Sequence, residues 1–527
     1  MAVHNLAGEL LDGALARGLG DRPALAQRDL SWSYREVRDF AARIGGGLER
    51  LGVERGARVA VVMPDSAEAV ASILGAIYGG YTAVPLSELG RPSDLRDCLN
   101  DSGAEVVIVQ AELEPSVSEV RAEIAALRWV IVAGEAPPGM RSLDDLAGGE
   151  PLPAAAPVTS DDVALLLYSA GVRANRPAGG PDPTAGALVG VPHRHDTPRR
   201  AYDSLAAGGL APREDDRVFS VVRVSKAYGL GSGALFPLAA GCQSILLPEQ
   251  PRSERIFEVI RDLAPTLLVA TPSIYRQLAL DAEAAGRQAP LAGFRLCLAG
   301  GEEMPAQVLE RTSRILGAKL VVGYGSTEAF QFVLAGEVSA DRPGACGEPL
   351  PGFEVRVVDD EGAPVGPDQI GTLQVRGSTV AHRYWGEAPA GDSAKAWFPT
   401  RDRFLVGEDG SYFHCGRADD LFKVGGRWLA PAEVERALLA HEAVWECAVI
   451  GAADDDGLTV PVAYVVPNIG QTPGPELESE LREYVKSVLT PYKYPRWIEF
   501  VDKLPRGPSG KLLRYKLRPP ERRRGGR

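Results

Sequence analysis

One stretch of the chain combines residue types that suit a phosphate ligand, and it reads Val-Val-Gly-Tyr-Gly-Ser-Thr-Glu over residues 321–328. Its apolar start predicts a buried strand, and its two glycines predict a loop at the end of that strand. The loop offers an aromatic face at Tyr324, a hydroxyl at Thr327 and a carboxylate at Glu328. Hydroxyls bind phosphate oxygens and carboxylates bind Mg²⁺, so the segment is a candidate phosphate and metal site. A plain strand-to-helix turn would explain the same residues. The evidence that separates the two interpretations comes from other segments of the chain.

Four further segments follow in the C-terminal part of the chain. They are Asp402, residues 416–420 (Gly-Arg-Ala-Asp-Asp), residues 422–426 (Phe-Lys-Val-Gly-Gly) and residues 504–511 (Leu-Pro-Arg-Gly-Pro-Ser-Gly-Lys). In their order and spacing the chain resembles the adenylate-forming superfamily of acyl-CoA synthetases, luciferases and peptide-synthetase adenylation domains. The resemblance runs from about residue 5 to residue 518.

Within that superfamily the chain is most similar to the benzoate-CoA ligase branch, through residues 227–231 (Ala-Tyr-Gly-Leu-Gly), 412–424 and 491–502. The resemblance implies a two-step reaction. A carboxylate attacks the α-phosphate of Mg·ATP to give an acyl adenylate and pyrophosphate, and the CoA thiolate then displaces AMP. Such catalysis depends on positioning and on stabilising charge at phosphate oxygens, so cations, hydroxyl donors and a metal ligand are the useful groups.

The resemblance also implies roles for single residues. Tyr324 would stack on adenine, Thr327 would bond the α-phosphate, and Glu328 would hold Mg²⁺. Asp402 would accept from the ribose hydroxyls, and Arg417 would contact ribose or phosphate. The other residues implied in binding ATP or CoA are Gly301, Glu302, Asp419, Lys423, Gly425 and Gly426.

Lys511 is the residue that the resemblance implies for adenylation, and it follows the flexible stretch Gly-Pro-Ser-Gly at residues 507–510. An ammonium group with rotatable donors suits the bond that forms between carboxylate and α-phosphate. Asp419 resembles the hinge about which the C-terminal domain turns between the two steps, and Gly425 and Gly426 would line the path of pantetheine, because glycine permits close backbone approach. A solvated surface lysine and an exposed turn are the alternatives for Lys511 and Asp419.

The resemblance places the acid pocket among three segments of the middle of the chain. A flat slot beside an aromatic ring and small glycines suits an arene better than a long acyl chain. Phe330 and Phe332 fit the pocket and a packed core equally. At Gln331 the benzoate-CoA ligase pattern usually has His, which favours a substituted arene or an acid other than benzoate. The implied pocket residues are Tyr228, Gly229, Gly300, Ala329 and Gln331.

The phosphate loop departs from the family pattern, which is close to Ser-Gly-Thr-Thr-Gly-x-Pro-Lys-Gly. Between Ser169 and Gly190 the two threonines are replaced by Val172 and Arg173, the lysine by Ala178, and about ten extra residues follow. We expect the loss of hydroxyls and an ammonium to weaken binding of the β- and γ-phosphates, although Arg173 and Arg176 offer another cation geometry. The alternative is a disordered insertion.

A second departure lies at residues 400–402, Thr-Arg-Asp, where the family usually has Gly in the middle. The side chain of Arg401 puts the usual approach of the backbone to ribose in doubt. His193 and His195 are two residues apart and have no third metal ligand nearby, so we do not expect a metal site there.

The elements that position these residues alternate between short apolar strands and helices over residues 57–132 and again over residues 218–323, which predicts two α/β units in tandem with parallel sheets. Strand pairs from about residue 346 predict a small β-rich unit. Residues 476–489 predict a helix whose apolar face includes Leu477, Leu481, Val485 and Val488.

The predicted fold class is therefore α/β. A large N-terminal domain (residues 1–418) would hold two stacked α/β subdomains and a small β-rich subdomain, a small mobile α+β domain would span residues 419–520, and a basic tail, 521–527, would be disordered.

The composition excludes several classes of function. With 527 residues, 45% of them hydrophobic and 24% charged, the chain is an ordinary globular protein. A net charge of −13 disfavours nucleic acid as a partner. Six well-separated cysteines predict buried free thiols, and the absence of a signal peptide or a long apolar run predicts a cytoplasmic protein without a membrane partner.

The function that these observations favour is an ATP-dependent, AMP-forming acid-CoA ligase for an aromatic carboxylic acid, with ATP, Mg²⁺ and CoA. One alternative is another acid or acceptor, such as carrier-protein loading or nitrite-dependent diazotisation of an aromatic amine. A second alternative is a non-catalytic nucleotide-binding relative with a decayed phosphate loop. We also consider a homodimer.

Overall fold

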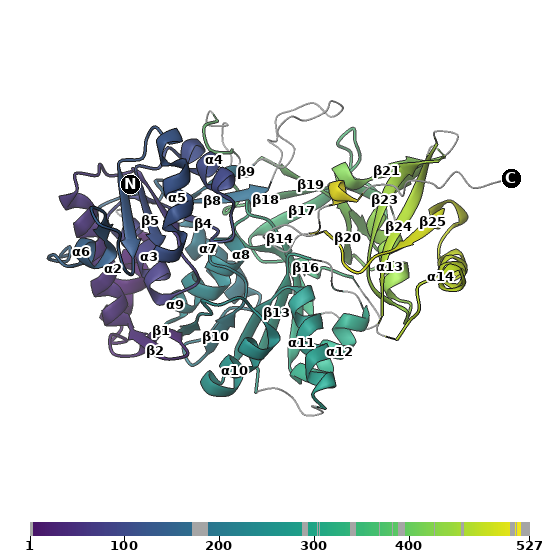
Figure 1. Cartoon of the computed structure of the whole chain (residues 1–527), viewed down its shortest axis with the longest axis horizontal. Helices are drawn as coiled ribbons and strands as arrows, with labels where there is room; N and C mark the ends of the chain where they lie inside the picture. Colours follow the sequence, from purple (N-terminus) through teal and green to yellow (C-terminus); the bar gives the residue numbers. More distant parts are fainter. Residues whose placement is uncertain are drawn as a thin grey trace.

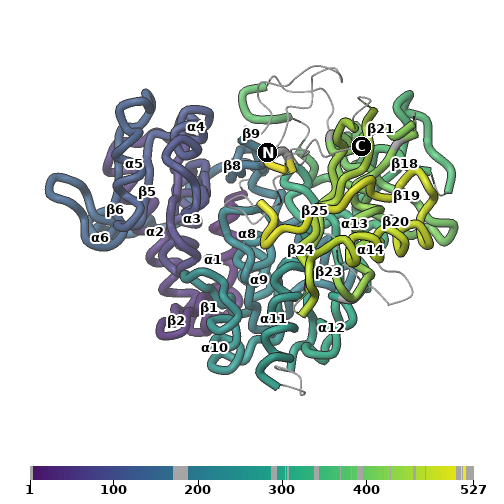
Figure 2. Tube along the Cα trace, turned by 45° about the vertical axis from the view of Figure 1, so that its right-hand side comes forward, coloured from purple at the N-terminus to yellow at the C-terminus, as the bar shows by residue number. Residues whose placement is uncertain are grey.

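The computed structural model describes residues 4–170, 188–286, 293–302, 304, 306–337, 344–367, 369–381, 383–387, 396–425, 427–454, 458–468, 470–505, 512 and 514–517. Two large sheets with their helices form the N-terminal part, and the last strands and helices of the chain lie on the opposite side of the molecule from the first sheet (Figures 1 and 2). Among these residues no helix is both long enough and apolar enough to cross a membrane.

The first sheet has seven strands in the order β7-β6-β5-β3-β4-β8-β9. All its pairs are parallel except β8 with β9. Strands in a parallel sheet are apolar on both faces, which is why the apolar runs at 57–62 and 104–109 predict them correctly. The strands are β3 (Arg58–Val62), β4 (Thr82–Leu86), β5 (Val106–Gln110), β6 (Trp129–Ala133), β7 (Arg141–Ser142), β8 (Val163–Ala170) and β9 (Leu188–Arg194).

The second sheet has nine strands in the order β16-β15-β14-β13-β12-β10-β11-β1-β2. Two strands from the start of the chain, β1 and β2, complete this sheet at the edge beside β11. Strands β8 and β9 come later in the sequence but belong to the first sheet. The two α/β units are stacked as predicted, but a strictly tandem order is wrong, because each sheet takes strands from beyond its own third of the sequence. The strands are β1 (Pro23–Gln27), β2 (Leu30–Ser33), β10 (Arg217–Ser220), β11 (Gln243–Ile245), β12 (Leu267–Ala270), β13 (Leu296–Gly300), β14 (Lys319–Gly325), β15 (Phe332–Glu337) and β16 (Glu348–Pro349).

Alternation along the strands divides the interior into layers. Val59 and Val61 of β3 face the core between the two sheets, whereas Ala60 and Val62 face the core on the outer side of the first sheet. In the same way Leu296 and Cys297 of β13 lie in different cores. A strand exposes successive side chains on opposite faces, so each sheet is covered by helices on both sides.

Helices fill the three layers that this arrangement creates. The layer between the sheets holds α1 (Leu6–Ala16), α2 (Tyr34–Arg50), α3 (Ala67–Tyr78), α6 (Leu143–Ala147), α7 (Thr197–Ala207), α8 (Ala227–Leu230), the π-helix η3 (Gly231–Leu235) and α9 (Phe236–Ala240). The outer layers hold α4 (Pro92–Ser102) and α5 (Glu114–Val120), with the short turns η1 (Ala111–Leu113) and η2 (Arg121–Glu123), on the first sheet, and α10 (Ser253–Leu263), α11 (Pro272–Ala284) and α12 (Ala306–Leu316) on the second.

A four-stranded antiparallel sheet confirms the predicted β-rich unit, and it consists of β17 (Phe353–Val358), β18 (Ile370–Gly377), β19 (Phe398–Val406) and β20 (Tyr412–Arg417). The C-terminal unit follows, with the hairpin of β21 (Phe422–Val424) and β22 (Arg427–Leu429) and the sheet of β23 (Val444–Ala453), β24 (Thr459–Pro467) and β25 (Trp497–Phe500). Its helices are α13 (Pro431–Leu439) and α14 (Pro475–Val488), and short turns are η5 (Ala418–Asp420), η6 (Pro491–Lys493) and η7 (Arg514–Lys516).

Two local predictions have clear outcomes. Helix α14 buries Leu477, Leu481 and Val485 as predicted, but Val488, the last residue of the helix, is 50% exposed. All six cysteines are buried free thiols, as predicted. The boundary predicted at residues 418 and 419 falls within η5 and stays a prediction, and the basic tail lies outside the described residues.

Candidate active site

The candidate site lies at the carboxyl edge of the second sheet, where β12, β13 and β14 end at Ala270, Gly300 and Gly325. Ligands of open parallel sheets bind at this edge, because the loops that follow the strands converge there. Tyr324 is the penultimate residue of β14, and the loop with Thr327 and Glu328 follows before β15 returns antiparallel to β14. The fold therefore places the predicted phosphate segment at this edge.

Tyr324 and Asp402 are joined by a hydrogen bond, in which the phenol of Tyr324 donates to Oδ2 of Asp402 at 2.5 Å. His414 stacks on the Tyr324 ring at 5.9 Å, and its Nε2 lies 3.6 Å from Oδ1 of Asp402. Arg417 approaches the same oxygen with Nε at 3.5 Å. Two strands of the four-stranded sheet, β19 and β20, thus hold a carboxylate beside the aromatic ring.

The charges of this cluster are fixed by its burial and its cations. Burial raises the pKa of Asp402, but the hydrogen bond and charge of His414, the charge of Arg417 and the Tyr324 hydroxyl together lower this pKa below its ordinary value. Burial and the Asp402 carboxylate raise the pKa of Tyr324 well above its ordinary value. The carboxylate is therefore ionised and the phenol protonated at neutral pH, which is the state in which Asp402 accepts hydrogen bonds.

Glu328 is oriented by a tyrosine from another segment. The Tyr384 hydroxyl donates to Oε1 of Glu328 at 3.0 Å, and the Glu328 carbonyl accepts from the Ala381 N–H at 2.7 Å. The Trp385 N–H, one residue further, donates to the carbonyl of Gly190 at 2.8 Å. Glu328 thus lies close to strand β9, which carries the distal end of the phosphate loop.

Glu328 suits a Mg²⁺ site in which the substrate and water supply most of the ligands. The described residues hold no cluster of three or more acidic, histidine or cysteine side chains that would make a complete protein cage. Mg²⁺ is commonly held by one or two carboxylates together with substrate phosphates and water, and Glu328 beside the hydroxyl of Thr327 matches that donor set.

Glu302 is held at a helix N-terminus. Its Oε2 accepts from the Ser273 N–H at 3.1 Å and from the Ser273 hydroxyl, at the start of α11. A carboxylate is favoured there by the free N–H groups of the first turn. Gly301, just before it, has φ of 85°, in the region that glycine adopts without strain. The carboxylate of Glu302 is therefore fixed in place after β13.

The predicted acid-pocket residues converge around one ring. Phe332 lies 4.9 Å from the ring of Tyr228, and a Cβ added to Gly300 or Gly323 would overlap the Phe332 ring. The Tyr228 hydroxyl donates to the Leu298 carbonyl at 3.1 Å. The ring of Phe332 therefore occupies the space beside Gly300 and Gly323. It limits the room that these two glycines leave in the candidate acid pocket.

The second aromatic residue of this segment belongs to the core. Phe330 is fully buried and packs edge-on against His193 at 5.1 Å and against Phe236 at 6.2 Å. His195, the other histidine of the pair, accepts from the Leu6 N–H at Nδ1. Burial lowers the pKa of His193 to about 3 and that of His195 to about 4, so both rings are neutral at pH 7.

Gln331 is buried and its amide is oriented at both ends. Its Oε1 accepts from the Phe332 N–H at 3.1 Å, and its Nε2 donates to the hydroxyl of Ser232 at 2.9 Å. Ser232 lies in η3, a π-helix, and such segments are frequent at functional sites. An added Cβ on Gly231 would lie 2.9 Å from Nε2 of Gln331, so the glycine makes room for the amide. Gly229 is equally constrained, because a Cβ there would overlap backbone carbonyls.

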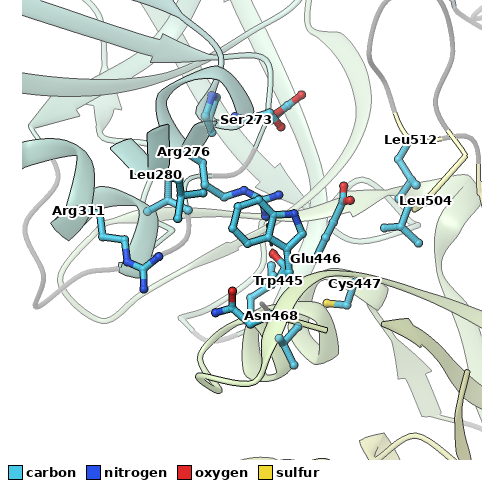
Figure 3. A pocket seen from close by; sticks show the side chains of 15 residues that line it. Ser273, Arg276, Leu280, Arg311, Trp445, Glu446, Cys447, Asn468, Leu504 and Leu512 are labelled. Atoms are coloured by element: carbon cyan, nitrogen blue, oxygen red, sulfur yellow. Dashed lines mark hydrogen bonds between the residues drawn. The ribbon is translucent and has the colours of Figure 1, made fainter. Parts of the chain in front are cut away.

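The C-terminal unit meets the site region through α11. Arg276 donates to the Trp445 carbonyl at 2.5 Å, and its guanidinium lies over the indole ring (Figure 3). A cavity of about 160 Å³ lies at this contact, and Glu302, Leu504 and Leu512 also line it. Leu504 and Leu512 bracket the segment that contains Lys511, so both flanks of that segment lie at the boundary, beside the turn after β13.

Several predicted site residues are not joined to this cluster by the described contacts. Lys423 is exposed on β21, and Gly425, with φ of 55°, follows it in the hairpin turn. The backbone of Asp419 lies in η5, directly after Arg417 and Ala418. Lys511, Gly426 and residues 171–187 of the phosphate loop lie outside the described residues.

Four residues that orient the predicted ones do not stand out in the sequence: Ser232, Ser273, Tyr384 and His414. His414 lies within a motif that carried the resemblance, and in the structure it is the register partner of Phe404 on β19. Tyr384 and Ser273 have no local signal, because their partners are 56 and 29 residues away in the sequence.

Together these features define an α/β protein with a candidate nucleotide site at the end of a parallel sheet. The chain belongs to the AMP-binding enzyme family, whose model matches residues 14–385, and the model of the AMP-binding enzyme C-terminal domain matches residues 433–511.

Similar proteins cover almost the whole chain. A 4-hydroxybenzoate–CoA/benzoate–CoA ligase of Rhodopseudomonas palustris is 38% identical over 519 residues, which are 98% of this chain and 94% of that protein. The solved anthranilate CoA ligase AuaEII in complex with anthranoyl-AMP has a TM-score of 0.87 and 32% identity, covering 98% of this chain and 97% of the other. A benzoate CoA ligase from Burkholderia xenovorans LB400 has a TM-score of 0.86 and 31% identity, covering 98% and 100%. The predicted family and fold class are confirmed.

Proposed function

We propose that this protein is an ATP-dependent, AMP-forming CoA ligase for a benzoate that carries a hydroxyl or another hydrogen-bond-accepting substituent. ATP, Mg²⁺ and CoA are the co-substrates and metal of the proposed reaction. The observation that carries the proposal is the pairing of Tyr324 with Asp402 beside Glu328 at the end of β14, in a chain similar to CoA ligases of benzoates over nearly its full length.

The geometry around Asp402 and Glu328 supports the proposed nucleotide half of the site. Asp402 is ionised and retains acceptor capacity for the two ribose hydroxyls, while the Tyr324 ring offers a face for adenine. Glu328 and Thr327 would hold Mg²⁺ together with phosphate oxygens, and the bound ion would neutralise charge on the leaving pyrophosphate. Lys511 would donate to the carboxylate and α-phosphate oxygens as their bond forms, and the position of Leu504 and Leu512 beside Glu302 supports that role.

The acid half of the site is specified by two donors. The hydroxyl of Ser232 donates to no described residue, and Gln331 uses one of its two N–H groups. Both side chains are buried, 4% and 3% exposed, and a buried donor without an acceptor costs roughly 1–3 kcal/mol. A hydroxyl substituent on the arene would accept from the second N–H of Gln331 and from the hydroxyl of Ser232. An unsubstituted benzoate would leave both donors without a partner.

The test is a product screen with the purified protein, ATP, Mg²⁺ and CoA. Benzoate, the three monohydroxybenzoates and the three aminobenzoates are supplied singly, and pyrophosphate release and aroyl-CoA formation are measured. We expect both products from at least one hydroxybenzoate at a higher kcat/KM than from benzoate.

Release of pyrophosphate without formation of a thioester would mean that the acceptor is not CoA. The next assays would then supply either a carrier protein, or nitrite together with an aromatic amine. Absence of pyrophosphate with every acid would contradict the proposal. The homodimer stays a prediction, which light scattering of the purified protein tests.

A further inference from the structure

We propose that Arg401 binds the triphosphate of ATP beside Glu328 and so replaces the phosphate-loop lysine whose position is Ala178 in this chain. The inference rests on the proposed function to the extent that ATP is the ligand. It concerns a position where the resembled family usually has glycine, so the arginine is a feature of this chain.

The backbone at Arg401 is in an unfavourable conformation. Its φ is 63°, and only Ala264 and Phe330 share a positive φ among the described residues other than glycine. The left-handed region costs a residue with a Cβ about 1–2 kcal/mol, whereas glycine adopts it freely. A strained side-chain-bearing residue where glycine would fit points to a function for that side chain.

The neighbours of Arg401 explain why the strain persists. Thr400 donates its hydroxyl to the Leu373 carbonyl at 2.9 Å and accepts from the Asp402 N–H at 3.2 Å. Asp402 is fixed by Tyr324. The register of β18 against β19 shifts between Gln374 and Thr372, so residues 400–402 bulge out of the ladder. Arg401 is therefore the middle residue of a pinned bulge.

The charge of Arg401 acts on the group that orients Glu328. Burial and the Glu328 carboxylate raise the pKa of Tyr384, and the positive charges of Arg401 and Arg417 lower it. Tyr384 is also the residue before Trp385, whose N–H reaches Gly190 of β9. The carboxylate proposed for Mg²⁺ and the end of the phosphate loop thus meet at Tyr384 and Trp385, and the charge of Arg401 reaches the tyrosine.

The chemistry of this arrangement suits a polyphosphate. A guanidinium binds phosphate oxygens through two parallel N–H bonds, and a carboxylate beside it takes the metal that bridges those oxygens. The family lysine and Arg401 would approach the phosphates from different segments, one from the β8–β9 loop and the other from β19. ATP binding then survives the loss of the loop lysine.

Binding of ligands to the whole protein tests the proposal directly. Calorimetric titration with Mg·ATP and with adenosine is made for the parent, Arg401→Gly, Arg401→Asn and the control Arg403→Ala. Glycine and asparagine both tolerate a positive φ, and Arg403 is the next arginine of β19, paired with Asp360 at 2.7 Å. We expect both Arg401 variants to weaken Mg·ATP at least tenfold, to leave adenosine within twofold, and to melt at or above the parent temperature. The control should match the parent for both ligands.

Three results would overturn the inference: Mg·ATP binding within twofold of the parent, an equal loss for adenosine, or an equal loss in Arg403→Ala. Loss of Mg·ATP binding together with the absence of any thioester in the product screen would refute the proposed function and leave the role of Arg401 standing.

Discussion

The guanidinium of Arg276 lies 4.2 Å from the centroid of the Trp445 ring, and this contact joins helix α11 of the large part to strand β23 of the C-terminal unit. The same region includes Leu504 and Leu512, on either side of the segment with Lys511. A contact that exists in one arrangement of the two parts stabilises that arrangement over any other.

Trp445→Ala should therefore slow the first half-reaction. A cation–π contact contributes about 1 kcal/mol, which corresponds to a roughly fivefold lower rate of pyrophosphate release if adenylation uses this arrangement. Transfer from a supplied aroyl adenylate to CoA should not slow. Arg311→Ala is the matched control, because Arg311 lines the same cavity from α12. Equal slowing of both half-reactions would show that Trp445 serves only folding.

Lys511→Ala should abolish adenylate formation while leaving transfer from a supplied aroyl adenylate largely intact. A loss of 10²-fold or more corresponds to about 3 kcal/mol of transition-state stabilisation. Lys503→Ala is the control, because Lys503 directly precedes Leu504 and lies outside the segment with Lys511. Pyrophosphate release close to the parent rate would refute the assignment of Lys511.

Glu328→Gln should raise the Mg²⁺ concentration needed for half-maximal activity with little change in melting temperature, because it keeps volume and removes the charge that a hard cation prefers. Tyr384→Phe removes only the 3.0 Å hydrogen bond to Glu328 and should shift the Mg²⁺ profile less. The measurements are Mg²⁺ titration and thermal unfolding of both variants. A large fall in melting temperature with an unchanged Mg²⁺ profile would make Glu328 structural.

Much of this fold is readable from local patterns, because both faces of the central strands are buried and their apolar runs are continuous. The sequence does not reveal that β1 and β2 complete the second sheet or that β8 and β9 complete the first. Strand order depends on packing between distant segments, such as the parallel register of Leu25 with Ser244, and no local pattern encodes it.

The site is partly readable for a related reason. Tyr324, Glu328 and Asp402 stand out through residue type and motif, whereas Tyr384 is recognisable only from its bond to Glu328. Arg401 was visible as a departure from glycine, but its meaning depends on a backbone φ of 63°. Residue types identify what binds a ligand, and tertiary contacts identify what orients those residues.

Asp65 should make the stability of the parent fall as pH rises. It accepts from the Val224 N–H at 3.1 Å, and burial raises its pKa to about 7 despite the opposing charge of Arg223, with Glu88 raising it further. An unfolded Asp has a pKa of about 3.9, so between about pH 4 and pH 7 only the folded state holds the proton, and stability declines through that window.

Asp65→Asn does not titrate, so its melting temperature relative to the parent should rise from pH 5 to pH 8. Thermal unfolding at unit pH steps measures the difference, with Asp39→Asn as an exposed control. A constant difference between the two curves would show that Asp65 is ionised in the folded protein throughout.

The Gln331–Ser232 pair gives the sharpest prediction about the acid. Gln331→Leu removes the amide that is held by the Phe332 N–H and directed at Ser232, and Ser232→Ala removes the hydroxyl while leaving the amide oxygen bonded. If these donors meet a substituent on the ring, each change should lower kcat/KM for the preferred hydroxybenzoate by roughly 10–100-fold, as expected for a lost hydrogen bond to a buried group. For benzoate, which makes no such bond, kcat/KM should stay level or rise.

The comparison of the two acids within each variant separates recognition from folding, because a structural defect lowers both kcat/KM values alike. Thr379→Val provides the control, since its hydroxyl bonds the Ala329 carbonyl at 3.0 Å in the same segment without facing Gln331 in any described contact. A parallel loss for benzoate and hydroxybenzoate in Gln331→Leu would mean that the amide only anchors the segment between Glu328 and Phe332. A loss confined to the hydroxybenzoate would identify Gln331 as the residue through which this chain, with glutamine where the benzoate-CoA ligase pattern usually has histidine, selects its acid.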